Sequence, residues 1–270
     1  MLPYLGLVTA VKNQGNCGSC VAFATTAVLE TNLLKAGAKM DGLDISDQHL
    51  VDCAHTSNHN TYYGNGCKGA PGHGYARFYN ENGKKMVHES KYPYVMKENN
   101  YVCKQTSYWN PGYKIEKGMW DYDCSDEKMK KLIYQYGAIS TGLGVDNGFY
   151  PFKKGVYDKC TTHSTNHAVV TVGWGTENGV DYWLIKNSWG KGWGDKGYIK
   201  VKRSKTLYIQ ISFLAYLSIM IFLKIPQVHV LFEDVFSLMS SQLVHHHRHL
   251  HHHHQLMSKL LVTCWRFLEN

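Results

Sequence analysis

Apolar side chains surround nearly the whole circumference of the segment 20–36, and Gly37 follows this segment directly. A helix that is hydrophobic on all sides lies in the interior of a protein, and glycine suits the left-handed backbone at a helix end. The pattern therefore predicts a buried central helix over residues 20–36.

Shorter helices are indicated by capping residues that precede apolar positions. Ser46 is suited to cap a helix that runs through Cys53, and another helix is expected over 70–80. Ser125 and the two acidic residues after it suit the positive end of a helix that stops at Gly137. The predicted helices thus precede most of the strands in the chain.

The later part of the chain changes to short β-rich segments at 168–174, 182–186 and 198–202, each bounded by turns that contain glycine. Helices followed by strands are typical of an α+β protein, here one with two lobes. A substrate cleft is expected between the lobes.

The composition changes character near Lys205, so residues 1–205 are expected to form the folded unit. The first lobe would span about 1–105 and the second about 106–205. The chain has 44% hydrophobic and 19% charged residues, which is typical of an ordinary globular protein.

The remaining segment, 206–270, is expected to be a tail outside the fold. It begins with an apolar run over 206–223, in which Gln210 is the only strongly polar residue, and it contains a histidine-rich tract over 245–254. The run is long enough to be a candidate membrane span, so a membrane is an expected partner only if the run is a genuine span. The tract is interpreted as low-complexity sequence.

The formal net charge is +8, and the basic residues are scattered instead of lying in a stripe. This distribution favours solubility and a mild attraction to acidic partners. It differs from the basic stripe of a nucleic-acid-binding surface. Nucleic acid is therefore not an expected partner.

Cysteine is dense in the first part of the chain, which favours an oxidising compartment. The chain opens without the charged start and apolar core of a signal peptide, so we expect upstream sequence to be missing. The cysteines are Cys17, Cys20, Cys53, Cys67, Cys103, Cys124, Cys160 and Cys264.

Cys20 is the candidate nucleophile. The run Gln14-Gly15-Asn16-Cys17-Gly18-Ser19-Cys20 places it at the first turn of the predicted buried helix. Unpaired N–H groups and the positive end of the helix dipole stabilise a thiolate, which is the reactive form of cysteine. Gln14 lies six residues earlier. Its amide N–H is expected to meet a developing oxyanion together with the backbone N–H of Cys20.

A base and a group that orients it are expected from the strands. His167 opens one predicted strand, and Asn187 closes the next. Adjacent strands would present these two side chains at one edge of the sheet, within hydrogen-bond reach. Such a pair can activate a nearby thiol and hold its base in position.

Four sequence blocks resemble the signatures of the papain family of cysteine proteases, in particular its cathepsin L-like members. They are Gln14-Gly15-Asn16-Cys17-Gly18-Ser19-Cys20, Leu50-Val51-Asp52-Cys53, Asn166-His167-Ala168-Val169 and Lys186-Asn187-Ser188-Trp189-Gly190. They occur in the family's order and cover roughly residues 7–204. A cysteine motif with its histidine and asparagine far downstream is a known signature of this family.

The resemblance implies an α+β, papain-like two-lobe fold, with a helical left lobe, an antiparallel β-barrel-like right lobe and the active-site cleft between them. It implies a cysteine endopeptidase that hydrolyses peptide bonds through a thiolate–imidazolium pair and an acyl-enzyme intermediate. The expected partners are peptide or protein substrates and cystatin-like inhibitors. The chain is expected to be a lysosomal or extracellular monomer without a cofactor or metal.

The resemblance also implies roles for individual residues. Gln14, Cys20, His167 and Asn187 correspond to the oxyanion donor, the nucleophile, the base and the orienting residue. Trp189 corresponds to the tryptophan that shields the His–Asn hydrogen bond from water. The implied substrate-binding positions are Gly18, Gly69, Ala70, Gly142, Asn166, Ala168 and Trp189. The implied disulfides are Cys17–Cys67 and Cys53–Cys103.

The sequence departs from the family's pattern at several positions. Val21 stands where an aromatic residue usually follows the nucleophile, and Ala70 stands where the family usually has the second of two glycines. The methyl group of Ala70 is expected to hinder a substrate backbone modestly. The ending after Lys205 does not match the family, so Cys160 is expected to stay unpaired.

Other interpretations remain open at this stage. The first two cysteines have the form of a redox C-x-x-C motif, but that interpretation leaves His167 and Asn187 unexplained. Four cysteines, Cys17, Cys53, Cys67 and Cys103, are candidate ligands of zinc, but their scattered spacing is unlike that of paired metal knuckles. The alternative function is a catalytically impaired or unstable family member, because the normal C-terminal segment is missing.

Overall fold

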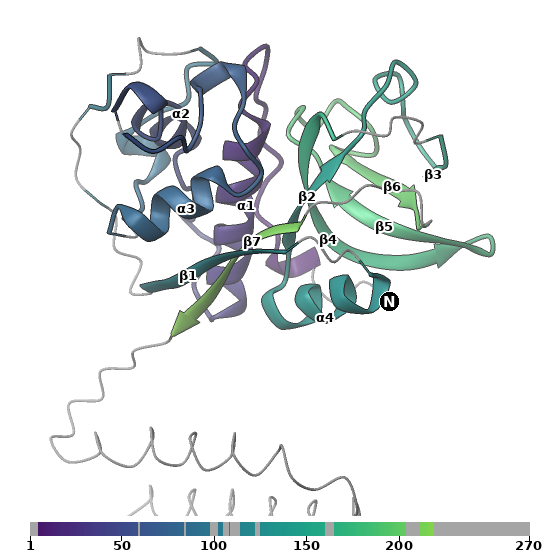
Figure 1. Cartoon of the computed structure of the whole chain (residues 1–270). Helices are drawn as coiled ribbons and strands as arrows, with labels where there is room; N and C mark the ends of the chain where they lie inside the picture. Colours follow the sequence, from purple (N-terminus) through teal and green to yellow (C-terminus); the bar gives the residue numbers. More distant parts are fainter. Residues whose placement is uncertain are drawn as a thin grey trace, which may run out of the picture. The chain divides into compact units, whose positions relative to one another are not determined.

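The computed structural model of the chain is shown in Figure 1. It describes residues 5–58, 60–83, 85–97, 102–104, 108, 114–121, 125–159, 165–203 and 211–218. Residues Met1–Met220 belong to one compact unit. Cys124, Cys160, Cys264 and the histidine-rich tract over 245–254 lie outside the described residues, as does the part of the predicted apolar run beyond 211–218.

The described residues contain the following helices and strands. The α-helices are α1 (Cys20–Lys35), α2 (Asp47–Cys53), α3 (Gly74–Glu81) and α4 (Asp126–Tyr136). Short 3-10 helices lie at η1 (Leu5–Leu7), η2 (Thr56–Asn58), η3 (Gly66–Lys68) and η4 (Glu89–Lys91). The strands are β1 (Lys114–Asp121), β2 (Ile139–Leu143), β3 (Val156–Tyr157), β4 (His167–Glu177), β5 (Val180–Lys186), β6 (Tyr198–Lys202) and β7 (Ile211–Ser218).

The predicted central helix is confirmed as α1. Every residue from 21 to 34 is buried, including Glu30 and Asn32. The chain leaves the helix through Gly37, whose φ of 98° is the left-handed conformation that favours glycine. The burial of all sides of the helix follows from its position between the left-lobe helices and strand β4.

The other predicted helices are found with one change of boundary. The side chain of Ser46 caps α2 by accepting a hydrogen bond from His49 N at 3.0 Å, and α4 ends before Gly137 as expected. Helix α3, however, begins at Gly74 and not at Ala70. Ala70 precedes a proline, and the proline ring disfavours the helical conformation of the residue before it.

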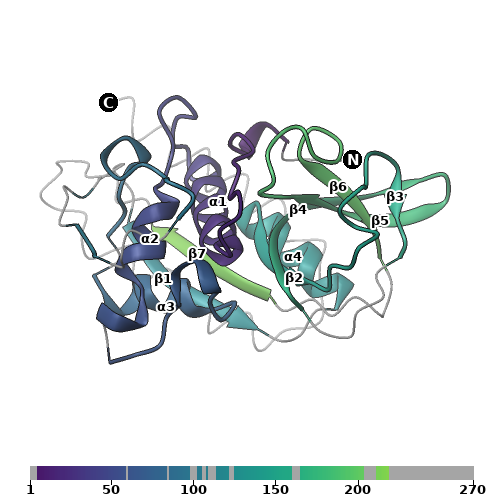
Figure 2. The ribbon, with the colours of Figure 1, turned by 90° about the horizontal axis from the view of Figure 1, so that it is seen from above.

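The described strands form one mixed sheet in the order β1-β7-β2-β4-β5-β6-β3. Neighbours are antiparallel except for β3 and β6, which are parallel. The order is open, so the described strands do not make a closed barrel. Helices α1, α2 and α3 gather on one side, and strands β4, β5 and β6 lie on the other (Figures 1 and 2). The predicted two-lobe α+β fold is confirmed.

The sheet continues beyond the boundary that was expected at Lys205. Strand β7 (Ile211–Ser218) pairs with β1 and β2, so this part of the predicted tail belongs to the sheet. An apolar run of this kind cannot be assigned to a strand or a helix from its periodicity alone. Among the helices of the described residues, none is both long and apolar enough to cross a membrane.

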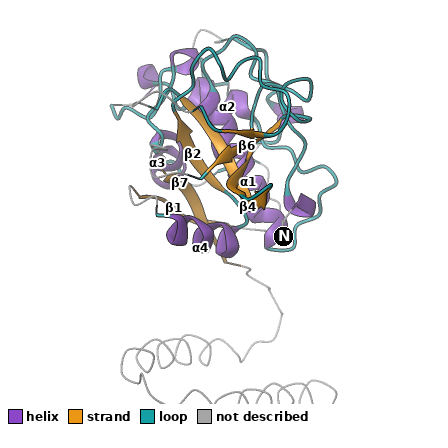
Figure 3. Cartoon of the chain, turned by 90° about the vertical axis from the view of Figure 1, so that its right-hand side faces the viewer, coloured by secondary structure: helices purple, strands orange, loops and turns teal. Residues whose placement is uncertain are grey.

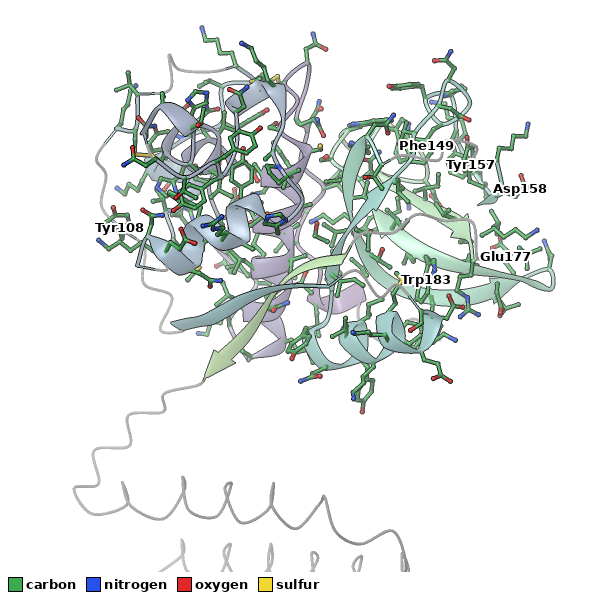
Figure 4. All side chains as sticks on the ribbon, viewed as in Figure 1. Tyr108, Phe149, Tyr157, Asp158, Glu177 and Trp183 are labelled. Carbon is green, nitrogen blue, oxygen red and sulfur yellow. A yellow bond between two sulfur atoms is a disulfide. The ribbon has the colours of Figure 1, made fainter. Side chains whose placement is uncertain are left out.

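Strand β4 separates two hydrophobic cores. Val170 joins the left-lobe cluster, which surrounds α1 and includes Leu50, whereas its neighbour Val169 joins the right-lobe cluster with Trp183 and Ile133. Successive residues of a strand point to opposite faces, so β4 is buried on both sides. In Figure 3, α4 and α2 lie on opposite sides of the strands. The right-lobe core also holds the T-shaped ring pair of Phe149 and Tyr157, labelled in Figure 4, with centroids 5.4 Å apart.

A buried ion network joins the N-terminal segment to α1 and α2. The ammonium nitrogen of Lys12 lies 3.1 Å from a Glu30 oxygen, 3.1 Å from an Asp47 oxygen and 2.7 Å from an Asp44 oxygen. Glu30 is completely buried, and it also accepts a hydrogen bond from Ile45 N at 2.8 Å. Burial lowers the pKa of Lys12, but Asp47 and Glu30 outweigh burial and raise the pKa well above its usual value.

The same network reaches the right lobe. Lys186, the last residue of β5, donates to the hydroxyl of Thr9 at 3.1 Å, and Thr9 in turn donates to Glu30. Burial lowers the pKa of Lys186 to about 8. The strand that leads to Asn187 is therefore tied to the helix that begins at Cys20.

Replacing Lys12 with Met is expected to destabilise the fold by about 3–5 kcal/mol, because Glu30 and Asp47 would stay buried without their cation. Urea denaturation of the two proteins at pH 7 measures the difference. The matched control is Arg77→Met, which breaks the solvent-exposed pair of Arg77 with Glu81 and should change stability far less. A Lys12→Met protein as stable as its parent would show that the network does not support the fold.

Candidate active site

Cys20 is the first residue of α1, and the turn before it is held closely against the left lobe. Gly18 N donates to Cys67 O at 2.9 Å, and a Cβ added at position 18 would lie 2.4 Å from that oxygen. Only glycine therefore fits at position 18 without moving the turn. The disulfide Cys17–Cys67 closes the same turn, so the thiol of Cys20 is carried on a rigid support.

Gln14 is buried behind this turn. Its amide nitrogen Nε2 donates to Cys17 O at 3.0 Å, and its Oε1 accepts from the hydroxyl of Ser188 at 2.6 Å. Its backbone N–H also donates to Ser188 O at 2.8 Å. An amide nitrogen carries two hydrogens, and the bond to Cys17 uses one of them. These contacts fix the side chain between the nucleophile turn and the segment that follows β5.

His167 and Asn187 form the hydrogen bond that the sequence predicts. His167 begins β4, Asn187 follows β5, and these two strands are paired neighbours. His167 Nε2 lies 2.8 Å from Asn187 Oδ1, which also accepts from Ser188 N at 2.8 Å. Because the amide oxygen faces the ring, Nε2 carries the hydrogen in the neutral imidazole. Nδ1 then has the lone pair that can take a proton.

Aromatic rings cover this pair, as expected for Trp189. The rings of His167 and Trp189 have centroids 4.8 Å apart, and Tyr150 stacks on Trp189 at 5.2 Å with an angle of 2° between the rings. Phe149 and Trp193 approach Trp189 with centroids 5.7 and 5.1 Å away. The His167–Asn187 bond beneath these rings is largely buried, since His167 is 8% and Asn187 is 2% exposed.

A groove of about 330 Å³ lies between the start of α1 and the loop after Cys67 on one side, and strands β2 and β4 on the other. It brings together most of the residues that the sequence singled out. Those that line it are Gly18, Cys20, Gly69, Ala70, Gly142, Asn166, His167 and Ala168. Gln14, Asn187 and Trp189 are not among its lining residues, but they contact residues of the site: Asn187 and Trp189 contact His167, and Gln14 bonds to Cys17.

The electrostatics of the two groove residues differ from the sequence-based expectation. Burial raises the pKa of the Cys20 thiol, although backbone N–H groups of Ala168, Val21 and Cys20 act in the opposite direction. Burial also lowers the pKa of His167, and the bond to Asn187 partly offsets this. The helix terminus therefore does not lower the thiol pKa by itself, because desolvation outweighs it.

Two tyrosines that the sequence analysis does not identify, Tyr94 and Tyr150, contact residues of the site. The hydroxyl of Tyr94 lies 2.8 Å from both Gln14 O and the hydroxyl of Ser19. Tyr150 is 58% exposed although it stacks on Trp189. Both tyrosines contact segments that are distant in the sequence, so a local sequence pattern does not predict their contribution to the site.

The predicted disulfides Cys17–Cys67 and Cys53–Cys103 are both present. The four cysteines are therefore paired two by two, which removes the interpretation of one shared zinc site. It also removes the C-x-x-C interpretation, because Cys17 is bonded to Cys67 and not to Cys20. Among the described residues, Cys20 is the free cysteine.

Comparisons with known proteins agree with this geometry. The family described as papain family cysteine protease matches residues 4–218. Pro-cathepsin H of Mus musculus is 37% identical over 210 residues, which are 74% of this chain and 58% of that protein. A cathepsin L-like proteinase of Fasciola hepatica is 34% identical over 219 residues, which are 78% of this chain and 61% of that protein.

A solved structure, that of the digestive procathepsin L2 proteinase from the larval midgut of Tenebrio molitor, is also similar. It superposes with a TM-score of 0.67 at 31% sequence identity, over 78% of this chain and 65% of that one. The chain thus spans about three fifths of the length of these curated relatives. It belongs to the papain family of cysteine proteases.

Proposed function

We propose that this protein is a cysteine endopeptidase, with Cys20 as nucleophile, His167 as base and Asn187 as the residue that orients the base. One observation carries the proposal. Cys20 and His167 line the same groove from opposite sides, and His167 is held by Asn187 at 2.8 Å. Nucleophile, base and orienting group are the three parts that covalent catalysis by a thiol requires.

The reaction follows from the tautomer of His167. Nδ1 takes the proton of the Cys20 thiol, and the thiolate attacks the carbonyl carbon of a peptide bond. The resulting oxyanion accepts hydrogen bonds from the backbone N–H of Cys20 and from the second amide hydrogen of Gln14. The intermediate expels the amine with the proton of the imidazolium, and water, deprotonated by His167, releases the acid from the acyl-enzyme.

The pKa directions are those of a thiol and an imidazole that each favour the neutral form when considered alone. Burial disfavours a thiolate alone and an imidazolium alone, as the raised pKa of Cys20 and the lowered pKa of His167 indicate. Adjacent opposite charges stabilise each other, so proton transfer between the two groups costs less than ionising either one by itself. Trp189 and its aromatic neighbours support the pair by excluding water.

The groove favours internal peptide bonds with a bulky apolar residue nearby. Gly142 and Ala168 line it and have small side chains, which leave room for a larger side chain of the substrate. The sequence between Cys67 and Cys103 contains no insertion long enough to suggest a blocked end of the groove. We therefore favour an endopeptidase over an exopeptidase.

The disulfides favour a lysosomal or extracellular location, where such bonds persist. The partners we propose are peptides or proteins as substrates and cystatin-like inhibitors that occupy the groove of a monomeric enzyme. A family member that binds peptides without cleaving them is the competing proposal. The retention of Cys20, His167, Asn187 and Gln14 argues against it.

Replacing Gln14 with Ala is expected to lower kcat by ~10²–10³ on a fluorogenic peptide amide, because the oxyanion loses one of its two donors. KM should change little, and alkylation of Cys20 should proceed at the parental rate. Gln135→Ala, which changes an exposed glutamine of α4, is the matched control and should keep the parental kcat. A parental kcat in Gln14→Ala would remove Gln14 from the oxyanion site.

Replacing Asn187 with Ala is expected to move the alkaline limb of the Cys20 alkylation profile to lower pH. The bond to Asn187 raises the pKa of His167, so its loss lowers the pKa, and the imidazolium loses its proton earlier as pH rises. Iodoacetamide rates measured from pH 4 to pH 10 give the profile. Asn82→Ala, outside the groove, should leave the limb in place. A limb that stays fixed, or moves upward, in Asn187→Ala would contradict the assigned role.

A further inference from the structure

A second cluster of chemically active side chains lies in the left lobe, outside the groove. His49, Cys53 and Cys103 each offer one ligand atom, and these atoms all lie within 4.8 Å of one another. We propose that this cluster is a redox-gated metal site. When the Cys53–Cys103 disulfide is reduced, the two thiolates and His49 bind Zn²⁺.

Helix α2 supplies two of the three ligands. His49 and Cys53 are four residues apart on this helix, and residues with this spacing lie on the same face. Both are buried, with exposed fractions of 5% and 3%, whereas Cys103 is exposed. The two ligands on α2 are therefore buried, whereas Cys103 lies on the side of the cluster that faces solvent.

One nitrogen of the buried His49 imidazole lacks a hydrogen-bond partner in the part of the chain that the structure describes. Its Nδ1 is buried and has no hydrogen-bond partner among the described residues. The ring lies between Tyr92 and Phe78, with centroids 5.9 and 6.1 Å away. A buried polar atom without a partner costs about 1–3 kcal/mol, and a coordinated ion would remove that cost.

Cys103 is positioned by more than its disulfide. The hydroxyl of Tyr92 lies 3.3 Å from Val102 O and accepts a hydrogen bond from Lys104 N at 3.2 Å, so it holds the residues on both sides of Cys103. The backbone oxygen of Tyr92 accepts in turn from the hydroxyl of Ser46 at 2.5 Å. The segment 102–104 therefore stays beside α2 after the disulfide is opened, and the three ligands remain close together.

A small monothiol can reduce the Cys53–Cys103 disulfide in two thiol–disulfide exchange steps. One thiolate attacks the sulfur of Cys103, which is the exposed residue of the pair, and Cys53 leaves as a thiolate. A second attacks the mixed disulfide, releases the Cys103 thiolate and forms the disulfide of the reductant. Zn²⁺ with two thiolates and a neutral imidazole has no net charge, and water can fill the fourth position. With Zn–S bonds of about 2.3 Å at a tetrahedral angle, the sulfurs would move to roughly 3.8 Å apart.

The test follows the two cysteines individually in the full chain. Free thiols, including Cys20, are first blocked with iodoacetamide, and the disulfides are then reduced with a phosphine. N-ethylmaleimide labelling is followed by peptide mass spectrometry with and without ZnCl₂. Zinc is expected to slow labelling of Cys53 and Cys103 about ten-fold or more, while Cys17 and Cys67 serve as the internal control and react at unchanged rates. Zinc bound by histidines elsewhere does not affect this readout.

Substitutions test whether His49 and Cys103 are ligands of the zinc ion. His49→Gln is expected to abolish the protection, whereas His73→Gln, a histidine outside the cluster, should retain it. If His49→Gln does not fold, Cys103→Ala replaces it, and the zinc-dependent protection of Cys53 should then disappear. Equal labelling with and without zinc at Cys53 and Cys103 in the parent would overturn the proposal. Protection that persists in His49→Gln, or that extends equally to Cys17 and Cys67, would also overturn it.

Discussion

The buried carboxylate of Glu30 is the point on which the arrangement of the two lobes depends. It lies inside α1, completely excluded from solvent, and it binds Lys12, the hydroxyl of Thr9 and the backbone N–H of Ile45. Thr9 also accepts a hydrogen bond from Lys186 at the end of β5. A buried charge that loses its partners is strongly destabilising, so these segments keep a fixed position relative to one another.

The groove is a consequence of this constraint. Helix α1 carries Cys20 at its first residue, and β5 delivers Asn187 one residue after Lys186. The network therefore holds the strand that orients His167 against the helix that presents the thiol. Effective covalent catalysis needs such fixed geometry, because small displacements of reacting groups lower rates sharply. Gln14 strengthens the connection, since it binds both Cys17 and Ser188.

The sequence predicts the parts of this site that local patterns determine. The helix that starts at Cys20 and the paired strands that present His167 and Asn187 follow from periodicity and turns. The apolar pattern alone places the start of α3 too early, because Pro71 disfavours the helical conformation of Ala70. Strand β7 was assigned to a tail because its continuous apolar run has no distinguishing period.

Other features depend on contacts between distant segments. Tyr94 meets Gln14 across 80 residues, and Lys186 meets Thr9 across 177, so neither contact has a local signal. The pKa of Cys20 is raised because the fold buries the thiol. The extent of this burial cannot be predicted from a sequence motif.

The central claim is that Cys20 is made nucleophilic by His167 across the groove. It is tested most directly by labelling the protein and its His167→Ala variant with a peptidyl epoxide at pH 6 and locating the adduct by peptide mass spectrometry. The account predicts one adduct, on Cys20, that forms far more slowly in His167→Ala. An adduct on another cysteine, or equal rates in the two proteins, would contradict it.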